Sequence, residues 1–125
     1  MILDTNAVSA LFAGDPALGE GLAGDDRHHL PVIVIGEYRY GLVRSRERGP
    51  LGRLFDLLIR ESIVLPLVGE TTEHYARVRE ELRRAGRPIP ENDVWIAALS
   101  RQYELPIVSR DNHFDGIAGV DRLSW

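Results

Sequence analysis

At 125 residues, with 44% apolar and 27% charged side chains, the chain is long enough to bury one hydrophobic core, and we expect a single domain over residues 1–125. It has no cysteine, which excludes disulfides, thiolate zinc sites and a cysteine nucleophile. The formal charge of −4 argues against a general polyanion binder, because broad affinity for nucleic acids normally comes from a basic surface. All fifteen basic residues are arginine, which excludes the phosphate-binding lysine of P-loop proteins and Schiff-base chemistry.

The start of the chain, MILD, is apolar for only three residues before an acid, so it lacks the basic region and apolar stretch of a signal peptide. No apolar run approaches the ~20 residues that span a membrane. The absence of cysteine mildly favours a reducing compartment. We therefore expect a cytoplasmic protein that does not contact a membrane.

In the first half of the chain, MILD predicts a short strand, and TNAVSALFAG predicts a helix that ends at Gly14, Asp15 and Pro16. After a second short helical stretch, the β-branched segment HLPVIV predicts the second strand. From about Ile35, apolar residues at helical spacing predict a helix that reaches Leu42. The segment LGRLFDLLIRE predicts an amphipathic helix, and SIVLPL predicts the third strand.

In the second half, TTEHYARVREELRRAG predicts a helix that ends at Gly86 and has one apolar face, made of Tyr75, Val78, Leu82 and Ala85. A further helix is predicted for PENDVWIAALSRQY, and a buried strand for LPIVS. RDNHFDGIAG predicts a loop that could include a turn of helix, and VDRLSW could be a last strand. Because strands alternate with helices, the order predicts an α/β fold with a mainly parallel sheet.

Four acids lie at the ends of these predicted elements. Asp4 closes the first strand, and Asp111 follows the strand LPIVS. Asp93 opens a helix, and Glu37 lies in the first turn or so after the second strand. Ligands of open parallel sheets bind beyond the carboxyl ends of the strands, so the four carboxylates could converge on one rim.

Such a cluster of acids repels itself unless a cation neutralises it. Oxygen ligands point to Mg²⁺ or Mn²⁺, since zinc prefers His or Cys. Two ions roughly 3.5 to 4 Å apart could activate a water and stabilise the leaving oxygen of a phosphodiester. The constellation is typical of a metal nuclease.

Each acid also has an ordinary structural explanation. Asp4 could cap the helix that follows it, Asp93 could be favoured by the helix dipole, and Asp111 could be a turn residue. The opening pair Asn92 and Asp93 could be no more than a helix cap. Glu37 has the strongest individual claim, because it places a charge among apolar residues, where an unpaired carboxylate is costly. The joint placement of the four acids favours the functional interpretation.

The segments that carry these acids, MILDTN, IVIGEYRYGL, IPENDVWIAA and LPIVSRDNHF, resemble the PIN-domain family, in particular the VapC-type toxins of toxin–antitoxin pairs. The resemblance spans nearly the whole chain. It implies a PIN-like three-layer α/β/α fold around a sheet of about five strands, and a Mg²⁺- or Mn²⁺-dependent endoribonuclease. It also implies a cognate VapB-like antitoxin and a homodimer or a toxin–antitoxin hetero-oligomer.

By motif, the resemblance assigns the metal ligands and catalytic acids to Asp4, Glu37, Asp93 and Asp111. Asp115 resembles a further acid that some members use. Thr5, Asn6 and Ser109 resemble the small polar residues that support the metal site.

Several residues near the four acids have two interpretations. Arg110 and Arg39 could contact RNA phosphates, whereas the Arg-rich stretch over residues 39–53 is equally well explained as a solvated helix end. His113 lies near the acids, but a metal mechanism needs no histidine base. Trp95 is better explained by packing than by stacking on a base.

Other functions remain open at this point. A housekeeping PIN nuclease of RNA processing or decay is a close variant, and a non-catalytic module that only binds a peptide or nucleic acid is a different class. Phosphoryl-transfer domains on a similar scaffold rely on a lysine that this chain lacks. The RNA target and its cleavage sequence cannot be read from the chain.

Overall fold

A computed structural model describes all of residues 1–125. The first half holds β1 (Ile2–Leu3), α1 (Thr5–Phe12), α2 (Pro16–Leu22), β2 (His29–Pro31), α3 (Val32–Leu42) and α4 (Arg48–Glu61). The second half holds β3 (Ile63–Leu65), α5 (Gly69–Arg84), α6 (Glu91–Tyr103), β4 (Ile107–Val108), the 3₁₀ turn η1 (Asn112–Phe114) and β5 (Arg122–Leu123). None of the helices is long and apolar enough to span a membrane.

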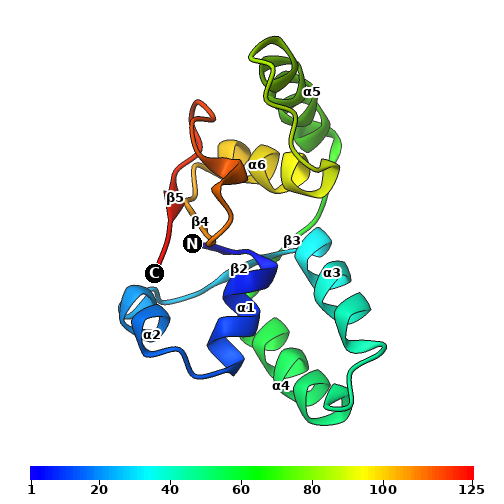
Figure 1. The fold of residues 1–125 in the computed structure, drawn as a ribbon, viewed down its shortest axis with the longest axis vertical. Helices are drawn as coiled ribbons and strands as arrows, with labels where there is room; N and C mark the ends of the chain where they lie inside the picture. Colours follow the sequence, from blue (N-terminus) through cyan, green and yellow to red (C-terminus); the bar gives the residue numbers. More distant parts are fainter.

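The five strands form one sheet in the order β3-β2-β1-β4-β5, and every neighbouring pair is parallel. Helices α1 to α4 lie on one side of this sheet, and α5 and α6 lie on the other (Figure 1). This arrangement follows from right-handed crossovers, because the chain moves outward from β1 to β3 and then returns across the opposite face to β4. The predicted three-layer α/β/α fold with a parallel sheet of five strands is confirmed.

The reversal of direction lies between β1 and β4. Ile2 pairs with Ile107 and Leu3 pairs with Val108, and the Asp4 amide donates to the Val108 carbonyl at 3.2 Å. The residues that follow these two strands, Asp4 and Ser109, are therefore neighbours. This is the switch point at which open parallel sheets bind their ligands.

The core fills the space between the strands and the helices on both faces. The strands contribute fully buried apolar side chains, as do both layers of helices: Ile2, Leu3, Leu30, Ile107, Val8, Val34, Phe55, Val78, Ile96 and Leu99. On α5, the predicted apolar face buries Val78 and Leu82, while Tyr75 stacks on Trp95 of α6 at 3.9 Å between ring centroids. The prediction that Trp95 is a packing residue is confirmed.

One predicted element boundary is wrong. The strand expected over HLPVIV ends at Pro31, and the β-branched residues Val32 to Val34 already belong to α3. Pro31 is the N-cap, with φ −61° and ψ 142°, so the chain leaves the strand and enters the helix without a loop. Val34 is fully buried, and its packing in the core overrides the preference of valine for strands.

Candidate active site

Asp4 stands at the centre of a hydrogen-bond network that joins β1 to β4. One carboxylate oxygen, Oδ1, accepts the Thr5 amide at 2.8 Å, and the other, Oδ2, accepts the Ser109 hydroxyl at 2.7 Å. The Asn6 side chain donates to Oδ2 at 3.3 Å and to the Ser109 oxygen at 3.1 Å. Asp4 is only 5% exposed. Asp4 is therefore the N-cap of α1, which is the structural role that the sequence offered for it, and it also belongs to the acid cluster.

Ser109 connects Asp4 to the next acid along the chain. Its hydroxyl oxygen accepts the Asp111 amide at 2.9 Å, while the side-chain oxygen Oδ1 of Asn6 accepts the Arg110 amide at 3.1 Å. The segment after β4 is thus fixed to the start of α1 by both side chains. The Thr5 hydroxyl is buried and has no hydrogen-bond partner.

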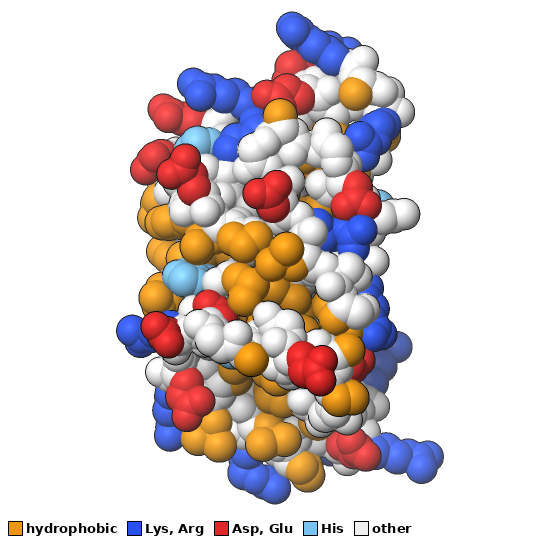
Figure 2. Space-filling model, turned by 90° about the vertical axis from the view of Figure 1, so that its left-hand side faces the viewer, with side chains coloured by type: hydrophobic (Ala, Val, Ile, Leu, Met, Phe, Trp, Pro, Cys, Tyr) orange, Lys and Arg blue, Asp and Glu red, His pale blue; other side chains and the backbone are white.

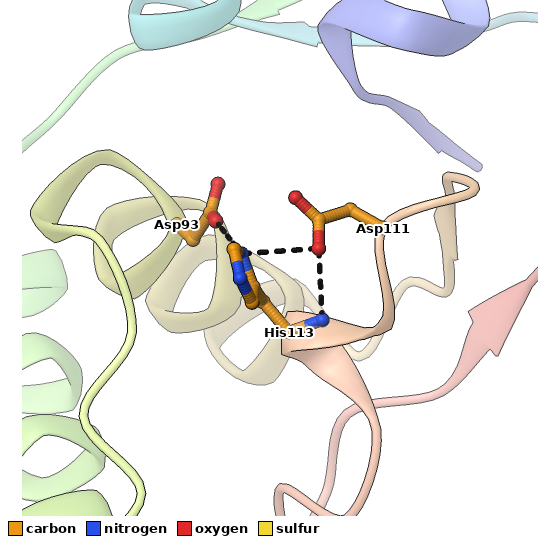
Figure 3. Close-up of side chains that lie close together, drawn as sticks. All are labelled: Asp93, Asp111 and His113. Carbon is orange, nitrogen blue, oxygen red and sulfur yellow. Dashed lines mark hydrogen bonds and ion pairs between the residues drawn. The ribbon is translucent and has the colours of Figure 1, made fainter.

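Asp93 and Asp111 face each other across the imidazole of His113 (Figure 3). His113 Nδ1 lies 2.8 Å from Asp93 Oδ2 and 3.0 Å from Asp111 Oδ1. The His113 amide also donates to Asp111 Oδ1 at 2.9 Å, which is the turn geometry expected of an Asp two residues before. The sequence placed His113 near the acids but gave it no role, and its contacts with both carboxylates are a finding of the structure.

Asp93 lies in the first turn of α6 and is 8% exposed. The positive end of the helix dipole favours a carboxylate there. Asn92, which the sequence explained as a cap or as nearby polar support, is not the cap: the N-cap is Pro90, no side chain caps the helix, and Asn92 is exposed. A residue inside the first turn points outward from the axis, whereas a cap must precede it.

Glu37 comes from the second turn of α3 and is partly buried. Its Oε1 atom is buried and has no donor in good hydrogen-bond geometry, although the Thr5 hydroxyl is near enough to oppose the rise in the pKa of Glu37. A buried carboxylate oxygen without a donor is costly, so this atom is suited to a ligand that the protein itself does not supply.

The four acids influence one another. Burial raises the pKa of Asp4, although the Ser109 hydroxyl and the Thr5 amide oppose the shift, and Asp111 adds to it. Burial also raises the pKa of Glu37, followed by repulsion from Asp4 and Asp93. The pKa of Asp93 is raised by burial and by Asp4 and Asp111, against the His113 hydrogen bond. The structure thus brings acids from four separate segments close enough to interact electrostatically.

The pKa of His113 is raised as well, but for a histidine this favours the charged form. Its hydrogen bond to Asp93 raises the pKa of the imidazole, and the negative charge of Asp111 adds to the effect. A positive group is therefore stabilised between the two carboxylates. Ligand atoms of Asp93, Asp111 and His113 all lie within 4.8 Å of one another, which is a spacing that one metal ion could bridge.

The other predicted site residues lie outside this cluster. Asp115 is exposed and pairs through both oxygens with Arg122, at 2.7 and 2.9 Å. Arg110 pairs with Asp15 at 3.0 Å and covers the ring of Trp125. Arg39 pairs with Asp56 at 3.3 Å.

Replacing Glu37 by Gln is expected to stabilise the metal-free protein by about 1 kcal/mol at neutral pH, because the change removes a repelled, partly buried charge. A carboxyl group with a raised pKa contributes stability while it is protonated and loses it as the pH rises through that pKa. The gain from Gln should therefore vanish below the ordinary glutamate pKa of 4.5.

Thermal unfolding in EDTA across this pH range measures the effect of Glu37→Gln. Glu20→Gln is the matched control, because Glu20 is exposed on α2 and makes no ion pair. An equal gain from both substitutions would assign the effect to net charge rather than to the acid cluster.

Comparison with known proteins gives a consistent result. The sequence model of the PIN domain family matches residues 1–120. Ribonuclease VapC5 of Mycobacterium tuberculosis is 30% identical, over 96% of this chain and 91% of that protein. Ribonuclease VapC1 of Haemophilus influenzae is 26% identical, over 99% of this chain and 96% of that protein.

Solved structures resemble the fold over almost its full length. DNA-bound VapBC from Salmonella typhimurium gives a TM-score of 0.88 at 24% identity, over 99% of this chain and 96% of that chain. VapBC-1 from nontypeable Haemophilus influenzae gives a TM-score of 0.86 at 26% identity, with the same coverage of each chain. The similarity extends through both layers of helices and the sheet that positions the acids.

Proposed function

Because this chain belongs to the PIN-domain family, we propose that it is a metal-dependent endoribonuclease and the toxin of a toxin–antitoxin pair. The observation that carries the proposal is the meeting of Asp4, Glu37, Asp93 and Asp111 at the switch point of the sheet. Relatives named as ribonucleases cover nearly the whole chain, which supports the nuclease over a binding module.

We assign the four acids to binding Mg²⁺ or Mn²⁺. The fit rests on a buried Glu37 oxygen without a well-aligned donor, and on the carboxylates of Asp93 and Asp111, which lie together with His113 within 4.8 Å. When bound, the cation would neutralise the acids, activate a water and stabilise the leaving oxygen of the phosphodiester.

The protein's own contribution is to hold these ligands in place. Ser109 and the Thr5 amide each occupy one oxygen of Asp4, so its carboxylate cannot rotate freely. Ser109 also accepts the Asp111 amide and thereby orients the turn that presents Asp111. In the proposed nuclease, Ser109, Thr5 and Asn6 therefore position the ligands rather than contact the RNA.

Few positively charged side chains would contact the RNA directly. Figure 2 shows charges of both signs interspersed around an apolar middle on one face, which fits the net charge of −4. We assign Arg110 and Arg39 to phosphate contacts, because both ion pairs are solvent-exposed and phosphate oxygens can compete for the guanidinium. Asp115 stays a weaker candidate for a further acid, since its carboxylate is paired with Arg122.

The proposed partner is a VapB-like antitoxin, together with a second toxin chain. VapBC complexes among the similar structures support this assignment. Two large apolar side chains at the end of α3 also support it, because Tyr40 is 77% exposed and Val43 is 66% exposed. Neighbouring apolar groups in solvent are typical of a surface that binds another chain.

The nuclease proposal is tested with purified, antitoxin-free protein and structured RNA. We expect cleavage with Mg²⁺ or Mn²⁺ and none in EDTA. Cleavage that persists in EDTA would overturn the metal mechanism. Growth arrest on expression, relieved by co-expression of the antitoxin, would establish the toxin, whereas unaffected growth of an active enzyme would favour a housekeeping nuclease.

A further inference from the structure

The imidazole of His113 turns one ring nitrogen toward two of the acids. Its Nδ1 atom is within hydrogen-bond distance of Asp93 Oδ2 and of Asp111 Oδ1, at 2.8 and 3.0 Å. In Figure 3 the ring lies between the two carboxylates. Nitrogen and oxygen ligand atoms are thus already gathered at one point.

The backbone keeps His113 in this position. Its amide donates to Asp111 Oδ1, and the next residue, Phe114, is fully buried in the core. The η1 turn therefore anchors the imidazole on both sides. The side chain remains 42% exposed, so solvent and a metal ion can reach it from outside.

We propose that His113 is a nitrogen ligand of the divalent cation held by Asp93 and Asp111, and that it makes the site select Mn²⁺ over Mg²⁺. The inference rests on the proposed function, because it concerns the same metal site. The inference adds His113, a nitrogen ligand, to a site that otherwise consists of carboxylates.

The selectivity follows from ligand chemistry. Mg²⁺ binds oxygen ligands and retains its waters, whereas an imidazole nitrogen suits transition metals better. The neutral tautomer with its proton on Nε2 leaves the Nδ1 lone pair free to bind, and Nδ1 is the atom that faces the carboxylates. Replacing this nitrogen by oxygen should therefore weaken the binding of Mn²⁺ more than the binding of Mg²⁺.

The test measures metal binding without RNA. Kd values for Mn²⁺ and for Mg²⁺ are determined by calorimetry for the wild-type protein and for His113→Asn, which places an amide oxygen near the position of Nδ1. We expect Mn²⁺ binding to weaken by about 10-fold or more and Mg²⁺ binding to change little. Pulsed electron paramagnetic resonance of bound Mn²⁺ should detect a coupled ¹⁴N nucleus in the wild type and lose it in the variant.

His28→Asn is the matched control. His28 Nδ1 lies 2.8 Å from Asp25 Oδ2, so this variant removes a similar His–Asp pair outside the site. Its metal affinities should equal those of the wild type. Unfolding in EDTA verifies that both variants fold.

Two results would overturn the inference. One is Mn²⁺ bound without a coupled nitrogen. The other is tighter Mn²⁺ binding by His113→Asn, which would mean that the imidazole competes with the cation. Either result leaves the nuclease proposal standing if Mg²⁺ or Mn²⁺ still supports RNA cleavage, whereas a protein that binds neither ion would contradict the metal site itself.

Discussion

Replacing Asp93 by Asn is expected to lower RNA cleavage by about 100-fold or more, because a lost metal ligand should cost at least as much as a lost supporting residue. The substitution preserves shape, and the Asn oxygen can still accept the His113 hydrogen bond. It removes the negative charge of Asp93, a residue that is 8% exposed and whose carboxylate is repelled by Asp4 and Asp111. The metal-free variant should therefore unfold at the same temperature as the wild type or higher.

The measurement pairs initial cleavage rates in Mn²⁺ with thermal unfolding in EDTA. Asp26→Asn is the control, since it makes the same chemical change at an exposed acid that has no hydrogen-bond or ion-pair partner. A loss of cleavage together with a loss of stability would mean that Asp93 serves the fold. Full activity with intact folding would remove Asp93 from the proposed mechanism.

Much of the acid cluster could be predicted because its positions are set by local patterns. Asp4 directly follows an apolar strand, and Asp111 follows LPIVS, so the parallel topology alone brings both to one edge of the sheet. Asp93 could be placed because it opens an apolar helix. These predictions need only element types and their order, which periodicity supplies.

The contacts between side chains could not be predicted in the same way. His113 reaches Asp93 because η1 is a tight turn with Phe114 buried beneath it. The sequence allowed a loop with a turn of helix there, but gave no contact between the two side chains. The two-residue spacing between Asp111 and His113 was the available signal, since an Asp often accepts the amide two residues on. Its partner Asp93 lies twenty residues away, and only the tertiary fold fixes that distance.

Asp115 illustrates how a motif can omit a competing partner. The sequence resemblance offered it as a further acid, but the structure pairs it with Arg122 on β5, and Arg122 also donates to the Ser109 carbonyl at 3.0 Å. The pKa of Asp115 is lowered by this arginine, opposite to the raised values of the buried acids. The pair between Asp115 and Arg122 forms only because β5 joins the sheet beside β4, and the sequence did not specify that position.

The arrangement of Glu37 depends on a packing contact that lies behind it. Tyr38, the next residue, packs in a tilted arrangement against Phe55 of α4, at 4.4 Å between ring centroids, and Phe12 of α1 meets the same ring at 6.4 Å. Phe55 is fully buried, and the guanidinium of Arg39 lies 5.6 Å from its ring centroid. This one side chain therefore joins three helices on the face of the sheet below the acids.

Replacing Phe55 by Ala is expected to lower the free energy of unfolding by about 3–5 kcal/mol, through lost apolar burial and the cavity that remains. Leu57→Ala on the same helix is the control, because Leu57 is 51% exposed and should cost less than about 1 kcal/mol. Urea unfolding at one protein concentration measures both, and equal slopes would permit direct comparison of the midpoints.

The consequence for the site distinguishes this substitution from a general loss of stability. Without the Phe55 ring, Tyr38 keeps only its edge contact with Phe12 at 5.8 Å. Helix α3 is then less restrained, so Glu37 should be held less firmly. At temperatures where Phe55→Ala remains folded, Mn²⁺ should therefore raise its unfolding temperature less than it raises that of Leu57→Ala. An undiminished response to Mn²⁺ would mean that Glu37 is positioned by α3 and the sheet alone, or that it does not contribute to binding the ion.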